Sequence, residues 1–153
     1  PPERDIMNRP PRRPDEPVLT RERGLLILAH GLLVATAAGL GFWIVYQGEP
    51  THLARARTVA FSIMAFSQLF FAIGCRSQRY TMPELGLFSN PWLLGAIVFS
   101  GLLQLSVVTL PFAQPIFEVA THLSWEWIPM SALSLAPVTI IEVCKLIRAR
   151  LSS

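Results

Sequence analysis

The sequence predicts an all-α membrane protein: a four-helix transmembrane bundle with short loops and both termini on the cytoplasmic side. Hydrophobic residues make up 52% of the 153 residues and charged residues only 15%, whereas charged residues are about 25% of a soluble domain. Four long stretches are nearly free of charge, each about long enough to cross the hydrocarbon core of a bilayer. The basic residues gather between these stretches, as they do beside membrane helices.

The distribution of basic residues predicts the orientation of the bundle. Eleven of the 13 lysines and arginines lie in residues 1–23, 75–91 and 143–153. Four spans would bring these three segments to one side and leave only Arg55 and Arg57 on the other. The richer side is therefore expected to be cytoplasmic. Because the net charge of +3 comes from basic flanks and not from a continuous basic face, no nucleic-acid partner is expected.

Residues 1–23 are expected to form a cytoplasmic connector, separate from a transmembrane domain at residues 24–153. The connector holds six prolines and many arginines, and Pro10, Pro11 and Pro14 forbid a regular helix. It is either a disordered segment or an extended strap that docks on another domain.

The first membrane helix is expected at about 24–46, where the chain is uncharged. A signal peptide is the alternative, because residues 35–37 resemble a cleavage site, but the apolar run continues past them. Gly31, Ala35 and Gly39 are four residues apart and make one small-residue face on which another helix can pack closely. His30 is expected to form a hydrogen bond with a neighbouring helix, because no second ligand stands at metal-site spacing.

The second membrane helix is expected at about 58–75, with one amide side chain, Gln68, near its middle. A polar group at that depth needs a partner inside the protein or a bound ion, because lipid offers none. Gln68 is either a hydrogen-bonding contact between helices or a group with a role in transport. The residue alone leaves both open.

The third and fourth helices are expected at about 92–110 and 129–147. Asn90 and Pro91 mark the start of the third helix, which carries a second amide, Gln104, and a short interfacial helix is expected at 116–123. The fourth helix contains Pro137, where a kink is expected. Near its basic end Glu142 and Lys145 are three residues apart and can pair. Five aromatic residues fall at predicted membrane boundaries: Trp43, Tyr46, Trp92, Trp125 and Trp127.

Little catalytic chemistry is visible. Asp5 and Asp15 are the only aspartates, and neither begins a phosphorylation motif of the DKTG type. The chain has no glycine-rich phosphate loop or metalloprotease motif. Cys75 and Cys144 are expected to be free thiols on a reducing side. This chain alone therefore has no visible machinery for ATP hydrolysis, and no cofactor is expected on it.

Four segments, in order, resemble the C-terminal four membrane helices of P-type cation-transporting ATPases of the calcium-pump type. Residues 5–12 (DIMNRPPR) resemble the connector after the sixth membrane helix in these pumps. Residues 57–61 (RTVAF), followed by Gln68, resemble the eighth helix, and residues 90–94 (NPWLL) resemble the opening of the ninth. Pro137, Glu142 and Lys145 resemble the tenth helix.

The resemblance implies a fragment of an ATP-driven pump, expected to move calcium. Such a pump would bind ATP, Mg²⁺ and the transported cation, with its nucleotide and phosphorylation domains and first six helices outside this chain. Its partners would be those parts and the lipid bilayer, and its expected location is the plasma membrane. By alignment Gln68 takes the position of an acidic ligand in the eighth helix of two-site pumps. A neutral amide can still offer an oxygen to a hard cation, and the loss of charge favours one calcium per cycle or another cation.

An independent small four-helix membrane protein is the alternative, either a regulatory subunit or a proton-coupled exporter. Such an exporter would usually need an acidic coupling group embedded in the membrane. The deepest acid in this chain, Glu142, is expected near the basic end of its helix.

Overall fold

The computed structural model of the chain describes residues 21–74, 90–120 and 123–151. All the regular elements in these ranges are helices: α1 (Arg21–Tyr46), the short 3-10 helix η2 (Pro50–His52), α2 (Leu53–Gly74), α4 (Pro91–Thr109), α5 (Gln114–Phe117) and α6 (Trp127–Leu151). Within these ranges α1, α2, α4 and α6 are long and apolar enough to cross a membrane. The predicted all-α, four-span membrane fold is therefore confirmed.

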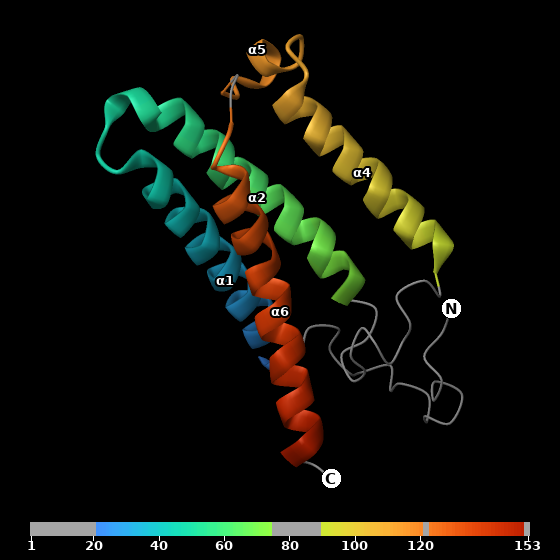
Figure 1. The fold of residues 1–153 in the computed structure, drawn as a ribbon. Helices are drawn as coiled ribbons and strands as arrows, with labels where there is room; N and C mark the ends of the chain where they lie inside the picture. The colour runs from blue at the N-terminus through green and yellow to red at the C-terminus, as the bar shows by residue number, and fades with distance from the viewer. Residues whose placement is uncertain (1–20, 75–89, 121–122, 152–153) are drawn as a thin grey trace.

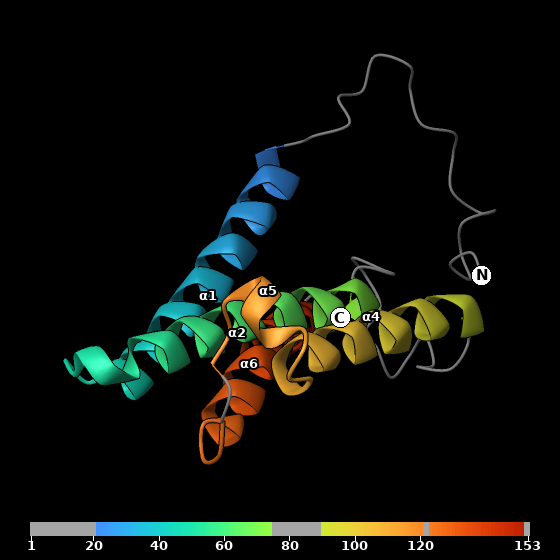
Figure 2. The same ribbon diagram turned by 90° about the horizontal axis from the view of Figure 1, so that it is seen from above.

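Helix α2 is the central helix of the bundle. It forms an antiparallel hairpin with α1, and α6 packs against both members of that hairpin (Figure 1). Helix α4 packs mainly against α2. Seen from above, the N-terminal end of α1 diverges from the other three long helices (Figure 2). Among the long helices that the structure describes, α2 alone packs extensively against all three others.

The apolar core lies at the end of the bundle where α1 and α2 are connected. Its buried members come from α1 (Ala37, Ala38, Val45), α2 (Ala56, Val59, Ile63) and α6 (Met130). Helix α1 approaches α2 closely here because Gly41 has no side chain. A Cβ atom at Gly41 would lie 2.2 Å from Cδ1 of Ile63. One small residue thus allows the large Ile63 side chain to pack fully buried between the helices.

The ends of the helices follow from local sequence. Helix α1 ends where Gln47 and Gly48 take positive φ values of 46° and 83°, a conformation that commonly terminates a helix. Helix α4 begins as predicted, because the Asn90 side chain accepts a hydrogen bond from the backbone N–H of Leu93 at 3.2 Å and Pro91 follows it. The local sequence therefore determines where α1 ends and where α4 begins.

Several predicted bounds differ from the observed ones. Helix α2 begins at Leu53, not near 58, and α6 runs from Trp127 to Leu151, beyond the predicted end at 147. The prediction followed the uncharged stretches, whereas a helix continues past the hydrocarbon when arginine and lysine, which are good helix formers, reach the interface. Arg21–Arg23 of the predicted connector likewise belong to α1; residues 1–20 lie outside the described ranges.

The predicted interfacial helix at 116–123 is wrong in its extent. Helix α5 covers only Gln114–Phe117 and ends at Glu118, which takes a left-handed conformation with φ of 52°. It starts early because Pro115 suits the first turn of a helix. The Gln114 side chain also donates to the carbonyl of Val108 at 2.9 Å, which ties the turn to the end of α4.

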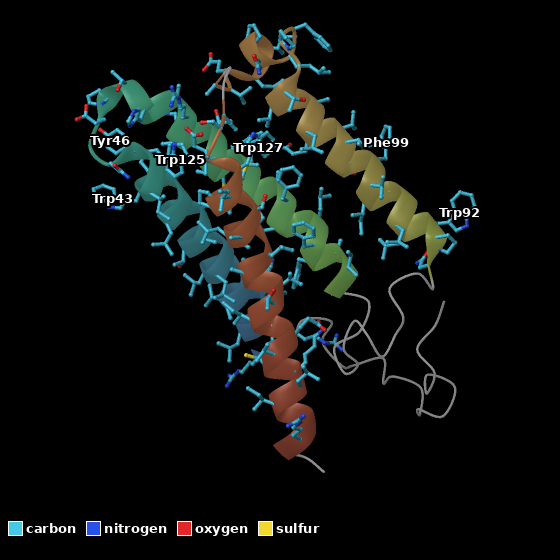
Figure 3. The ribbon with its side chains drawn as sticks, in the orientation of Figure 1. Trp43, Tyr46, Trp92, Phe99, Trp125 and Trp127 are labelled. Atoms are coloured by element: carbon cyan, nitrogen blue, oxygen red, sulfur yellow. The ribbon has the colours of Figure 1, made fainter. Side chains whose placement is uncertain are left out.

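Aromatic residues mark the two ends of the bundle, as the sequence predicts. Trp43, Tyr46, Trp125 and Trp127 gather at one end, and Trp92 lies at the opposite end of α4 (Figure 3). Tryptophan and tyrosine favour the level of the lipid headgroups, so the two groups are placed where the membrane surfaces are expected.

Candidate functional site

Gln68 lies on a face of α2 that no described helix covers. This face, called the Gln68 face below, consists of exposed residues at helical spacing: Ala54, Arg57, Phe61, Met64 and Gln68. The buried residues of α2, including Val59 and Ile63, lie on the other side of the helix. The candidate ligand therefore faces away from α1 and α6, toward space that another part of a larger protein or lipid would fill.

Gln68 supplies the one side-chain oxygen on this face. A Gln side chain presents an amide carbonyl, which is a suitable ligand for Ca²⁺. No group of three or more His, Cys, Asp or Glu residues in the described part of the chain could hold a metal ion. A cation near Gln68 would therefore need its remaining ligands from other chain segments.

The orientation of α2 is held by polar contacts with the segment that contains α6. Near the Trp125 end of the bundle, the Thr58 hydroxyl accepts a hydrogen bond from the backbone N–H of Ala120 at 2.8 Å. In the middle, the hydroxyl of Ser67 donates to the carbonyl of Ser134 at 3.1 Å. These contacts were not predicted from the sequence, where the available signal was that Thr58 and Ser67 carry small hydroxyl side chains inside an apolar span.

A buried carboxylate adds a third contact at the Trp125 end. Glu126 is only 1% exposed; it accepts hydrogen bonds from the backbone N–H of Ser124 at 2.7 Å and, more weakly, from Arg55 at 3.5 Å. Burial by itself raises the pKa of Glu126, but the hydrogen bonds from Ser124 and the Arg55 charge outweigh it and lower the pKa below its ordinary value. Glu126 is therefore a charged anchor between α2 and the start of α6.

The opposite end of α2 is closed by Lys145 from α6. The ammonium group donates to the carbonyl of Gly74, the last residue of α2, at 3.0 Å and to Glu142 at 2.8 Å. The predicted Glu142–Lys145 pair is confirmed. A cation at a helix C-terminus satisfies a carbonyl that lacks an intrahelical donor and is favoured by the helix dipole. The pair thus caps α2 and joins it to α6.

Three other polar side chains in the membrane region have no hydrogen-bond partner within the described residues. Both ring nitrogens of His30 are buried and unpaired, and its ring stacks on Phe71 with a centroid distance of 3.5 Å. The expected hydrogen bond of His30 is therefore absent from this part of the chain. The hydroxyl of Ser62 and the amide nitrogen of Gln104 are likewise unpaired.

The small-residue face of α1 is uncovered in the described chain. Gly31, Ala35 and Gly39 are exposed, and a Cβ atom at either glycine would meet nothing within 4 Å. The close approach of α1 to α2 uses Gly41 instead, on a different side of the helix. The expectation that Gly31, Ala35 and Gly39 pack against protein stays a prediction.

Of the expected free thiols, Cys144 is a free, exposed cysteine, whereas Cys75 lies outside the described ranges. Within the described ranges Cys144 belongs to no group of three or more His, Cys, Asp or Glu residues that could hold a metal ion. It therefore adds no ligand to the Gln68 face.

Nearly the whole chain is similar in sequence to known proteins. A family model described as "Cation transporting ATPase, C-terminus" matches residues 1–147. The chain is 35% identical over 149 residues to a calcium-transporting ATPase of Bacillus subtilis, with 97% of this chain and 17% of that protein covered.

Two further relatives come from distant organisms. A probable cation-transporting ATPase F of Mycobacterium tuberculosis is 33% identical, with 92% of this chain and 15% of that protein covered. The calcium-transporting ATPase type 2C member 2 of Mus musculus is 30% identical, with 95% and 16% covered. The chain spans about a sixth of the length of these relatives.

Proposed function

The chain belongs to the family of cation-transporting ATPase C-terminal regions, and we propose that it works as the last four membrane helices of a P-type pump that exports calcium. The main support for this proposal is the family match over residues 1–147, together with calcium-transporting relatives in both bacteria and mammals. In such a pump the chain scaffolds the transport helices and lends the Gln68 carbonyl to one cation site.

The uncovered faces of the bundle support a role inside a larger pump. The exposed Gln68 face of α2 and the exposed face of Gly31, Ala35 and Gly39 on α1 are the surfaces available to the earlier membrane helices. The fifth helix is the expected partner of the small-residue face. ATP and Mg²⁺ would bind in cytoplasmic domains outside this chain, and the plasma membrane is the proposed location.

The alternative of an independent exporter or regulatory subunit is not favoured. The family match covers nearly the whole chain. In addition, the deepest acid, Glu142, is paired with Lys145 at 2.8 Å at the end of α6, where a proton-coupling group would be neutralised by its neighbour.

The test is calcium-dependent ATPase activity of the purified full-length pump with substitutions at Gln68. Gln68→Ala should raise the half-saturating calcium concentration by about three- to tenfold, since the loss of one neutral ligand is taken to cost about as much as one ordinary net hydrogen bond. Phosphorylation by ATP should persist. Gln68→Glu should change both the affinity and its pH dependence, because a carboxylate at that depth needs an ion or a proton.

Gln104→Ala is the matched control, because it removes a second intramembrane amide from a different helix, α4. It should leave calcium affinity unchanged. An ATPase that calcium does not stimulate would contradict the proposed substrate. Calcium affinity and stoichiometry that match wild type in both Gln68 variants would show that Gln68 is not a ligand.

A further inference from the structure

We propose that Ser67 is a positioning residue that holds the Gln68 carbonyl at the cation site by fixing the rotation of α2 against α6. This inference rests on the proposed function, because it assigns a second residue to the same site. It differs from a ligand role: Ser67 faces the core and does not reach the Gln68 face.

The first support is the pattern of contacts around α2. Polar contacts join α2 to residues 120–145 at three heights: Thr58 and Arg55 near one end, Ser67 in the middle and the Gly74 carbonyl at the other end. The packing of α1 on α2 is different in kind, because its core in the described ranges is apolar and is joined by the ring stack of His30 on Phe71. The segment containing α6 therefore provides the directional contacts that set the rotation of α2.

The second support is the geometry of the middle contact. Ser67 and Ser134 are each 1% exposed, and the hydroxyl-to-carbonyl distance is 3.1 Å. Two of the end contacts use the long side chains of Arg55 and Lys145, which can follow a small movement of the backbone. The third end contact uses the short side chain of Thr58, but Thr58 lies about 15 Å along the helix from Gln68. The Ser67 side chain is short, so its hydrogen bond tolerates little rotation of the helix.

The third support is the adjacency of Ser67 and Gln68. Consecutive residues of an α-helix are separated by about 100° around the axis, so the direction of one fixes the direction of the next. At about 5–6 Å from the axis, a rotation of about 10° moves a side-chain group by about 1 Å. Metal–ligand distances vary by only about 0.2 Å. Loss of the Ser67 bond can therefore disturb coordination without unfolding the bundle.

The Ser134 carbonyl, which accepts the hydrogen bond from Ser67, lies near a proline inside α6. Ser134 is three residues before Pro137, which is buried inside α6. Pro137 has no N–H and leaves the carbonyl of Leu133 without its usual donor, so this part of α6 has a weakened internal hydrogen-bond pattern. The Ser134 hydroxyl is used within α6, where it donates to the carbonyl of Met130 at 2.6 Å. Because the acceptor is backbone, the contact has to be tested at Ser67.

The chain supplies a matched control in Ser62. It lies on the same helix and is fully buried, but its hydroxyl has no hydrogen-bond partner among the described residues. Ser67→Ala and Ser62→Ala remove the same atom from two buried positions, and only the first removes a contact with α6. Both are compared in the full-length pump by calcium-dependent ATPase activity and thermal stability.

Ser67→Ala should raise the half-saturating calcium concentration by about threefold, the effect of one lost net hydrogen bond, with a maximal rate within about twofold of wild type. Ser62→Ala should leave the affinity unchanged. In a Gln68→Ala background, Ser67→Ala should no longer shift the affinity, because the carbonyl that it positions is absent.

Each other outcome overturns the proposal. Equal affinities for the two serine variants would show that the hydroxyl is structural only, as would a lower melting temperature with unchanged affinity. A Ser67→Ala shift that persists in full in the Gln68→Ala background would show that Ser67 acts by another route. If Gln68→Ala itself leaves the affinity unchanged, the ligand role in the proposed function fails first, and the positioning role fails with it.

Discussion

Glu126 shows how this protein keeps a charge buried at the membrane surface. Its carboxylate is almost completely covered, which by itself disfavours the ionised form. The short hydrogen bond from the backbone of Ser124 compensates for the lost water more than the half-exposed Arg55 does, because the Arg55 contact is long at 3.5 Å. The anchor therefore depends mainly on the local turn before α6 and only secondarily on the ion pair.

Glu126→Gln should destabilise the protein at neutral pH and lose this effect in acid. The folded pKa is lowered from 4.5, so the carboxylate contributes stability above that value and loses it as the pH falls through the folded pKa. At pH 7 the variant should lose about 1–3 kcal/mol, the cost of a disrupted buried hydrogen-bond network.

Thermal unfolding in detergent at pH 7 and at about pH 3.5, below the unfolded pKa of a glutamate, measures the difference. Glu118→Gln, at an exposed carboxylate in the same connection, is the control and should have no effect. A melting-temperature difference for Glu126→Gln that stays constant across this range would contradict the assignment of a buried charge.

The residue scale is also where sequence reasoning was least complete. Gln68 stood out because it is an amide in the middle of an uncharged span. Ser67 did not, because its sequence setting is the same as that of Ser62 and only the position of α6 distinguishes them. Inter-helix partners such as the Ser134 carbonyl lie far apart in the chain, and spacing within one helix does not encode them.

At the scale of the element, α1 presents two separate packing faces. Gly41, on one side, lets Ile63 pack against the helix. The row of Gly31, Ala35 and Gly39 is centred about 120° away around the axis and is exposed. The spacing of the small residues predicts a face for close helix packing, which stays a prediction, and it could not indicate that the α1–α2 contact would use Gly41.

Ala35→Leu in the full-length pump should impair folding or activity, because a larger side chain in the middle of the small-residue face would separate α1 from the helix that covers it. Overpacking of this kind costs about 1–3 kcal/mol. Folded yield and calcium-dependent ATPase activity are the measurements.

Ala29→Leu makes the same change on the same helix, at an exposed position outside that face. It should be tolerated far better. Equal tolerance of the two substitutions would mean that the small-residue face meets lipid and not protein.

Element boundaries were predicted unequally well, for a physical reason. The Asn90–Pro91 start of α4 was predicted because capping is a local interaction. The start of α2 at Leu53 and the end of α6 at Leu151 were missed, because charged residues end the hydrophobic signal without ending the helix. The short α5 was misplaced because its end depends on the left-handed conformation of Glu118, a residue type that does not demand it.

At the scale of the whole molecule, composition was enough to predict four membrane helices, and the order of four motifs was enough to predict the family. The arrangement of the helices was not predictable in this way. Helix α2 is central and α4 packs mainly on it, because complementary side-chain shapes from distant segments select these neighbours. The uncovered faces then follow from the arrangement, and they indicate where the rest of a pump would pack.

The orientation of the bundle in the membrane stays a prediction from charge and is testable directly. In a full-length pump with Cys75 and Cys144 replaced by serine, a single cysteine is introduced by Glu49→Cys, between α1 and η2, or by Gly86→Cys, in the basic segment 75–91. The positive-inside rule places residue 49 outside and residue 86 in the cytoplasm.

In intact cells a membrane-impermeant thiol reagent should therefore label the Glu49→Cys variant and spare the Gly86→Cys variant. In permeabilised cells it should label both, which controls for the reactivity of each thiol. Equal labelling of the two variants in intact cells would be incompatible with α2 crossing the membrane between them. Labelling of the Gly86→Cys variant alone would reverse the orientation, and the basic segments would then face outward against the charge distribution that predicts their position.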